Sequence, residues 1–113
     1  MFEIVMYSRT TSCPFVTLAK RVLDDNGLPY REIYIDKDEE AKKRVLEWTG
    51  FLAVPTIVVA WTGDQTPISA PDFLERGRSP RGIDRGHLIT EPNIDELTRW
   101  LAKHGFVAEP ARD

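Results

Sequence analysis

The residue with the clearest chemistry is Cys13, the only cysteine among the 113 residues of the chain. It lies where an extended apolar run gives way to apolar residues at helical spacing, and Pro14 suits the first position of a helix. Cys13 is therefore predicted to be the N-cap residue of that helix. The unpaired amides and the positive end of the helix dipole favour an anion, so the thiolate form of Cys13 is expected to be stabilised there.

Two interpretations of Cys13 are open. Free cysteine is among the most buried residue types, so Cys13 could be a small core residue. The polar residues 10–12 before it and the predicted helix start favour a reactive thiol instead. A second cysteine three residues later would complete a redox pair, but that position is Val16. Because no disulfide can form within the chain, a redox cycle has to pass through a mixed disulfide with another molecule.

The elements that position Cys13 follow from apolar periodicity and turn residues. Asn93 and Glu96 have the spacing of a capping box at the start of a last helix. The chain is predicted to form one α/β domain over residues 1–113 in the order β-α-β-α-β-β-α, with a frayed tail at 108–113. Strands are predicted at 2–7, 30–35, 54–61 and 87–90, and helices at 14–26, from Asp36 or Asp38 to Trp48, and from Asn93 to about His104.

Residues 62–86 are predicted to be an insertion between the third and fourth strands. Their first half is turn chemistry throughout, and the stretch from Glu75 to Arg85 carries four arginines against two acids. A long connection of this kind is either a solvated insertion or a functional segment. In the functional interpretation it is a lid or docking surface beside Cys13 that adds positive potential near the thiolate. Its arginines are Arg76, Arg78, Arg81 and Arg85.

Three segments resemble the glutaredoxins: Tyr7-Ser8-Arg9, Cys13-Pro14-Phe15, and residues 49–59 with Val54-Pro55. The resemblance runs from residue 1 to about residue 60. It implies a thioredoxin-like fold, with a four-stranded mixed sheet and helices on both faces, in a monothiol form. It also implies a cis bond before Pro55, which turns the Val54 main chain toward the thiol. A peptide-like thiol substrate would then pair with Val54 as a short added strand.

The resemblance further implies a substrate site around the cysteine. Arg9, Pro14 and Phe15 would contact the substrate, although the family's basic residue usually stands three residues before the cysteine and Arg9 stands four before. Glutaredoxins hold the γ-glutamyl end of glutathione with a segment that opens the last helix. Residues 68–72 and 89–93 are the candidates, and the second is preferred because a capped helix follows it, so Thr90 and Asn93 would bind. Glutathione or a similar low-molecular-weight thiol is the implied co-substrate, with no tightly bound cofactor.

Composition and charge bear on the protein's partners, location and metal sites. The net charge of −3 gives no reason to expect nucleic acid or an acidic membrane surface as a partner, and the apolar runs are shorter than the ~18 residues of a membrane span. The first residues lack the basic region of a signal peptide. A lone cysteine fits a reducing compartment, so a cytoplasmic location is expected. His87 and His104 are isolated from other metal ligands in sequence, so no zinc site is expected.

Two functions from different classes are consistent with these patterns. In the first, the protein is a monothiol thiol–disulfide oxidoreductase, and Cys13 acts on protein mixed disulfides that contain a low-molecular-weight thiol. In the second, it is a non-catalytic thioredoxin-fold module that binds a partner through the arginine-rich insertion, with Cys13 as a modification site. An arsenate-reductase-like role is a weaker third alternative, since an arginine-rich loop can hold an oxyanion.

Overall fold

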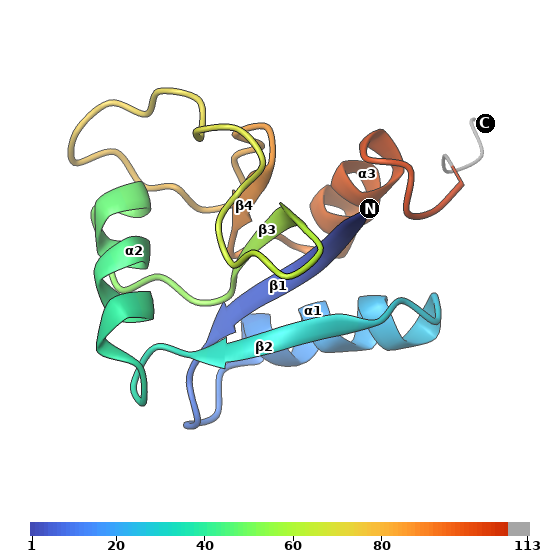
Figure 1. Ribbon diagram of the computed structural model, residues 1–113, viewed down its shortest axis with the longest axis horizontal. Helices are drawn as coiled ribbons and strands as arrows, with labels where there is room; N and C mark the ends of the chain where they lie inside the picture. Colours follow the sequence, from blue (N-terminus) through green and yellow to red (C-terminus); the bar gives the residue numbers. More distant parts are fainter. Residues whose placement is uncertain (109–113) are drawn as a thin grey trace.

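A four-stranded mixed sheet organises the computed structural model, which describes residues 1–108. The strand order is β2-β1-β3-β4, with β1 and β2 parallel and the other neighbours antiparallel. The predicted element order and mixed sheet are confirmed, whereas most of the expected frayed tail lies outside the described residues. The strands are β1 (Phe2–Ser8), β2 (Tyr30–Tyr34), β3 (Thr56–Trp61) and β4 (Leu88–Thr90), and the helices are α1 (Pro14–Asp25), α2 (Glu39–Thr49) and α3 (Ile94–Lys103) (Figure 1).

The central strand β1 is covered on both faces. Its residues from Ile4 to Ser8 are all buried, and successive side chains of a strand point to opposite faces. Tyr7 packs edge-on against Trp48 of α2, with 5.4 Å between ring centroids. Ile4 lies on the other face near Phe106, which follows α3, and α3 contacts α1. Helix α2 therefore covers one face and α1 and α3 cover the other, and Figure 1 shows α2 standing apart from the other two helices.

Two helix ends set the positions of the segments around the thiol. Helix α1 begins at Pro14, directly after Cys13, and buries apolar side chains along one face. Helix α2 has Asp38 as its N-cap, not Asp36, and ends at Gly50, whose φ of 79° lies in the left-handed region that glycine adopts without strain. The chain then runs from Gly50 to the start of β3. Within residues 1–108, no helix is long and apolar enough to cross a membrane.

The connection 62–87 between β3 and β4 is tied to the sheet at several points. The Val59 N–H donates to the His87 carbonyl, and the Ile68 N–H donates to the Val59 carbonyl, both at 3.0 Å. The returning part forms isolated bridges to Thr90 and Ile89, the last two residues of β4. It therefore covers the edge of β4, which would otherwise offer unpaired backbone groups. In Figure 1 the connection passes above α2 and returns to β4.

Arg85 anchors this connection to α2. Its side chain is 7% exposed, its Nε donates to the Asp72 carbonyl at 2.8 Å, and its Nη1 donates to the Trp48 carbonyl in the last turn of α2. Carbonyls at a helix end lack partners within the helix, so a guanidinium is well suited to satisfy one. Arg85 is therefore a structural residue of the connection, and the expectation that the four arginines add positive potential near Cys13 stays a prediction.

Arg85→Gln should lower the free energy of unfolding by about 2 kcal/mol, because hydrogen bonds from a charged group are lost and buried carbonyls are left unpaired. Urea denaturation followed by circular dichroism measures this change. Arg76→Gln, at an exposed position of the same connection, is the control and should stay within about 0.5 kcal/mol of the original protein. Equal stability of the two variants would show that Arg85 does not anchor the connection.

Candidate active site

Cys13 is the N-cap residue of α1, as predicted, with extended backbone angles of φ −147° and ψ 122°. Its carbonyl accepts the Thr17 N–H at 3.0 Å, which closes the first turn of the helix. The thiol makes no capping hydrogen bond and is directed at the Val54 carbonyl, with 3.8 Å between Sγ and oxygen. Cys13 is 8% exposed, so the thiol is largely enclosed and lies between the start of α1 and the segment before β3.

The Val54–Pro55 segment presents backbone groups beside this thiol. The peptide bond between the two residues is cis, in agreement with the sequence-based expectation. The Pro55 carbonyl accepts the Glu91 N–H at 2.8 Å, and the Ala53 carbonyl accepts the Thr56 hydroxyl at 2.9 Å. Val54 is 3% exposed, yet within residues 1–108 its N–H has no hydrogen-bond acceptor. Buried backbone donors are nearly always paired, so this unpaired N–H distinguishes Val54 from the other residues beside the thiol.

Arg9 and Cys13 line the same surface hollow. This hollow has a volume of about 310 Å³. Asp36 holds the turn before the cysteine, because its carboxylate accepts both the Thr10 N–H, at 3.2 Å, and the Thr10 hydroxyl. The hydroxyl bond is the main reason that the pKa of Asp36 lies below its usual value. The hollow is lined by Arg9, Thr10, Thr11, Ser12, Cys13, Val16, Thr17, Lys20 and Tyr34.

Lys20 is a residue of this hollow that the sequence analysis missed. Its Nζ lies 2.9 Å from the Glu32 carboxylate, and this contact raises the pKa of Lys20. The ammonium therefore stays protonated at neutral pH beside the cysteine. Cys13, Thr17 and Lys20 have the spacing i, i+4 and i+7 that places residues on one face of a helix. That spacing is the signal in the sequence that identifies Lys20.

Phe15 and Arg81 form a second side of the site. Phe15 is half-buried, and the Arg81 guanidinium lies over its ring, 4.9 Å from the centroid, whereas Pro14 is exposed. The prediction that the insertion reaches the cysteine face is thus confirmed for Arg81. A hollow of about 250 Å³ lies next to this pair and is lined by Phe51, Leu52, Ala53, Ser79, Pro80, Arg81 and Glu91.

Thr90 and Asn93 use their side chains in the protein's own hydrogen bonds. Thr90 is fully buried at the end of β4, and its hydroxyl lies 3.3 Å from that of Thr56. Asn93 accepts the Glu96 N–H at 2.8 Å, while the Glu96 carboxylate accepts the Asn93 N–H at 2.8 Å. The predicted capping box is confirmed. The substrate-binding roles of Thr90 and Asn93 stay predictions. Both side chains already have a structural role in these hydrogen bonds.

The model of the family described as Glutaredoxin matches residues 4–61, which is just over half of the chain. The chain belongs to the glutaredoxin family. The matched part contains β1 from Ile4 onward, the cysteine, α1, β2, α2 and all of β3. The connection 62–87, with Arg81 and Arg85, lies outside the matched part. Glutaredoxins are thiol–disulfide oxidoreductases, and the thioredoxin-like fold predicted for this chain agrees with the observed sheet and helices.

Two glutaredoxins illustrate the extent of the similarity. One from Ricinus communis is 32% identical over 59 residues, covering 50% of this chain and 57% of its own length. This chain thus spans little more than half the length of that curated relative. The crystal structure of the glutaredoxin grx-1 from Archaeoglobus fulgidus is 34% identical over 53% of this chain and 70% of its own, with a TM-score of 0.42.

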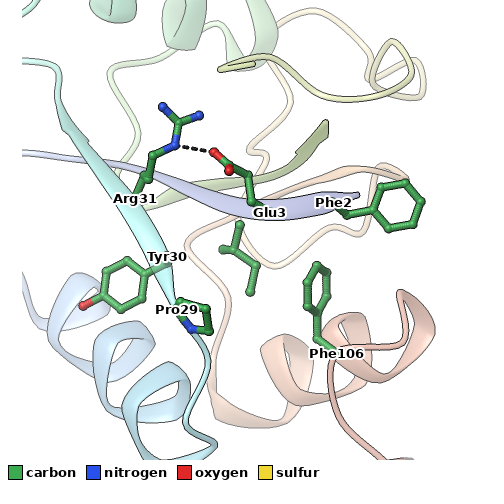
Figure 2. Close-up of a pocket in the computed structure, with 7 residues that line it drawn as sticks. Phe2, Glu3, Pro29, Tyr30, Arg31 and Phe106 are labelled. Atoms are coloured by element: carbon green, nitrogen blue, oxygen red, sulfur yellow. Dashed lines mark hydrogen bonds and ion pairs between the residues drawn. The ribbon is translucent and has the colours of Figure 1, made fainter. Parts of the chain in front are cut away.

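A separate hollow of about 330 Å³ lies at the start of β1 (Figure 2), whereas Cys13 follows the end of that strand. Its lining is mainly apolar, and the ion pair between Glu3 and Arg31 lies at its rim. It contains none of the predicted site residues. Within residues 1–108, no three histidine, cysteine, aspartate or glutamate side chains gather as a metal site. The hollow is lined by Phe2, Glu3, Ile4, Pro29, Tyr30, Arg31 and Phe106.

Asn93→Ala should lower the free energy of unfolding by about 1 kcal/mol, because alanine cannot accept the Glu96 N–H at the start of α3. Asn93→Asp should keep the stability, since aspartate is an equally good N-cap and its charge suits the helix dipole. Urea denaturation of the two variants checks the difference. If Asn93→Ala is as stable as the original protein, the capping box contributes nothing measurable to stability.

Proposed function

We propose that this chain is a monothiol thiol–disulfide oxidoreductase that acts through Cys13 on mixed disulfides between proteins and a low-molecular-weight thiol. The observation that carries the proposal is the approach of the Cys13 thiol to within 3.8 Å of the Val54 carbonyl, next to the unpaired Val54 N–H. A nucleophile at a helix N-terminus thus lies beside a backbone edge that can hold a peptide-like substrate. Family membership supports the same class of reaction.

The reaction proceeds by two thiol–disulfide exchanges. The Cys13 thiolate attacks the sulfur of the small thiol in the mixed disulfide, a new disulfide forms, and the substrate protein leaves as a thiolate that takes a proton from water. A second small thiol, as thiolate, then attacks the small-thiol sulfur bound to Cys13. This step releases Cys13 and a disulfide of two small thiols. The protein sulfur is reduced and the second small thiol is oxidised, so the electrons balance without a bound cofactor.

The residues around Cys13 have separable roles in these steps. The amides at the start of α1 and the helix dipole stabilise the thiolate, and Arg9 and Lys20 add positive charge from the same hollow. The Val54 N–H and carbonyl pair with the substrate main chain as an added strand. Val16 stands where a resolving cysteine would be, so Cys13 is regenerated by exchange with a second small thiol. Glutathione or a similar thiol in a reducing, cytoplasmic compartment is the proposed co-substrate.

A second candidate function is a binding module that docks a partner through the tip of the connection 62–87. Phe73 is 89% exposed there, close in sequence to Arg76 and Arg78. An exposed aromatic residue beside arginines has the composition of a binding surface. The adjacent hollow has a volume of about 470 Å³ and is lined by residues 47–50, 71, 73–77 and 85. In this alternative Cys13 is modified but does not turn over.

Cys13→Ser should abolish reduction of a mixed disulfide between glutathione and a cysteine peptide, because one nucleophile carries both exchanges. Val16→Cys should keep the activity within a few-fold, since a second cysteine offers only a competing exit. Release of the peptide thiol, followed by chromatography, measures both rates. Retained turnover in Cys13→Ser would refute the oxidoreductase proposal and favour the module.

Iodoacetamide should alkylate Cys13 several-fold more slowly at pH 7 in a double variant, Arg9→Gln with Lys20→Gln, than in the original protein. The thiolate is the nucleophile, and these two cations lie in the same hollow as Cys13. Mass spectrometry of samples quenched along a time course gives both rates. Equal rates in the two proteins would show that the cations do not act on the thiol and would support the binding module.

A further inference from the structure

Arg81 is held in place by two contacts beside the cysteine motif. Its guanidinium lies 4.9 Å from the centroid of the Phe15 ring, and its Nε donates to the Glu91 carboxylate at 2.8 Å. The ring contact and the Nε hydrogen bond together restrict the position of the guanidinium. Among residues 1–108, no hydrogen-bond partner engages its Nη groups. The terminal donors of an oriented guanidinium are therefore left for a ligand.

Glu91 is the less exposed member of this ion pair, with 18% of its side chain exposed against 62% for Arg81. Its backbone is fixed beside the cis-proline, because its N–H donates to the Pro55 carbonyl at 2.8 Å. Its φ of 44° lies in the left-handed region, which is unfavourable for a residue with a Cβ atom and is enriched at functional sites. Glu91 thus orients Arg81 from a rigid position next to the proposed substrate edge.

The hollow beside the pair borders the segment that leads into the cis-proline. It is lined by Ala53, and the next residue, Val54, presents its carbonyl to the Cys13 sulfur. The arm of a peptide that pairs with Val54 would extend into this hollow. Apart from Arg81 and Glu91, its lining residues are uncharged. Because the two charges offset each other, attraction at long range is weak and recognition depends on direct contact with the Nη donors.

We propose that Arg81 is a specificity-determining residue whose Nη edge binds a carboxylate flanking the reacting cysteine of the substrate, with Glu91 as the positioning residue. The substrate class is therefore cysteine peptides that carry a carboxylate next to the disulfide. A guanidinium binds a carboxylate through parallel hydrogen bonds, which an amide of the same shape cannot reproduce. The proposal rests on the proposed function, since it assigns the substrate of the same thiol. In this proposal a direct contact with Arg81 alone, in place of long-range attraction by four arginines, selects the substrate.

The test measures the first exchange alone. The symmetric disulfides of N-acetyl-Glu-Cys-Glu-amide and N-acetyl-Gln-Cys-Gln-amide have the same shape and differ in charge. The Cys13 thiolate attacks one sulfur, a protein–peptide disulfide forms, and the second peptide leaves as a thiolate that takes a proton from water. Stopped-flow mixing with mass spectrometry gives the second-order rate constant. Each variant is compared with the original protein on the same disulfide, so the different leaving-group strengths of the two peptides cancel.

Arg81→Gln should slow the reaction with the acidic disulfide about tenfold, because a charge-assisted contact is lost, and should change the reaction with the amide disulfide less than twofold. Arg99→Gln, a matched change at an exposed arginine of α3, should leave both rates unchanged. No loss, or an equal loss with both disulfides, in Arg81→Gln overturns the proposal.

Glu91→Ala tests whether Glu91 acts by orienting Arg81 or only through its negative charge. Removal of a negative charge would by itself speed the acidic disulfide, whereas loss of the Nε acceptor lets Arg81 turn away. A slower reaction with the acidic disulfide, and not with the amide, is the expected result, and a faster one would exclude Glu91 as a positioning residue. The two proposals also fail separately. Cys13-dependent turnover without an Arg81 effect removes only the specificity, and an Arg81 effect without turnover of mixed disulfides removes only the oxidoreductase activity.

Discussion

The contact between the Cys13 thiol and the Val54 carbonyl is the one on which the proposed site depends. It links the segment after β1 to the segment before β3. Cys13 is held by the first turn of α1, and Val54 is held by the carbonyl contacts of Ala53 and Pro55. Neither partner belongs to a strand or lies within a helix. Their separation therefore depends on the pairing of β1 with β3 and on the end of α2 at Gly50.

The connection 62–87 is built into this arrangement more firmly than a solvated insertion would be. Arg85 joins it to the last turn of α2, and Trp100 of α3 donates to the Gly86 carbonyl at 2.9 Å. Gly82 lies so close to the Glu96 carboxylate that a Cβ atom would approach an oxygen to 2.5 Å. The same anchoring brings Arg81 over Phe15. The connection 62–87 lies outside the part of the chain that matches the family, yet its Arg81 contacts Phe15 within that part.

Local patterns predicted most of the fold, since each depends on residues close in sequence. The N-cap position of Cys13 and the capping box of Asn93 and Glu96 both follow from residue types and spacings within one or two turns. Long-range contacts could not be predicted in this way. The burial of Arg85 depends on a carbonyl of α2 that lies far away in sequence, and nothing near Arg81 distinguishes it from Arg76 or Arg78.

The central claim is that Cys13 and the Val54 main chain act as one docking unit for a peptide-like disulfide. Amide hydrogen exchange at Val54, followed by NMR in the free protein and in the protein joined through Cys13 to a cysteine peptide, tests this claim most directly. If the peptide pairs with Val54, the Val54 N–H gains an acceptor and should exchange roughly tenfold or more slowly in the adduct. Gly63, in the turn after β3, should exchange at the same rate in both forms. An unchanged rate at Val54 in a fully formed adduct would contradict the account.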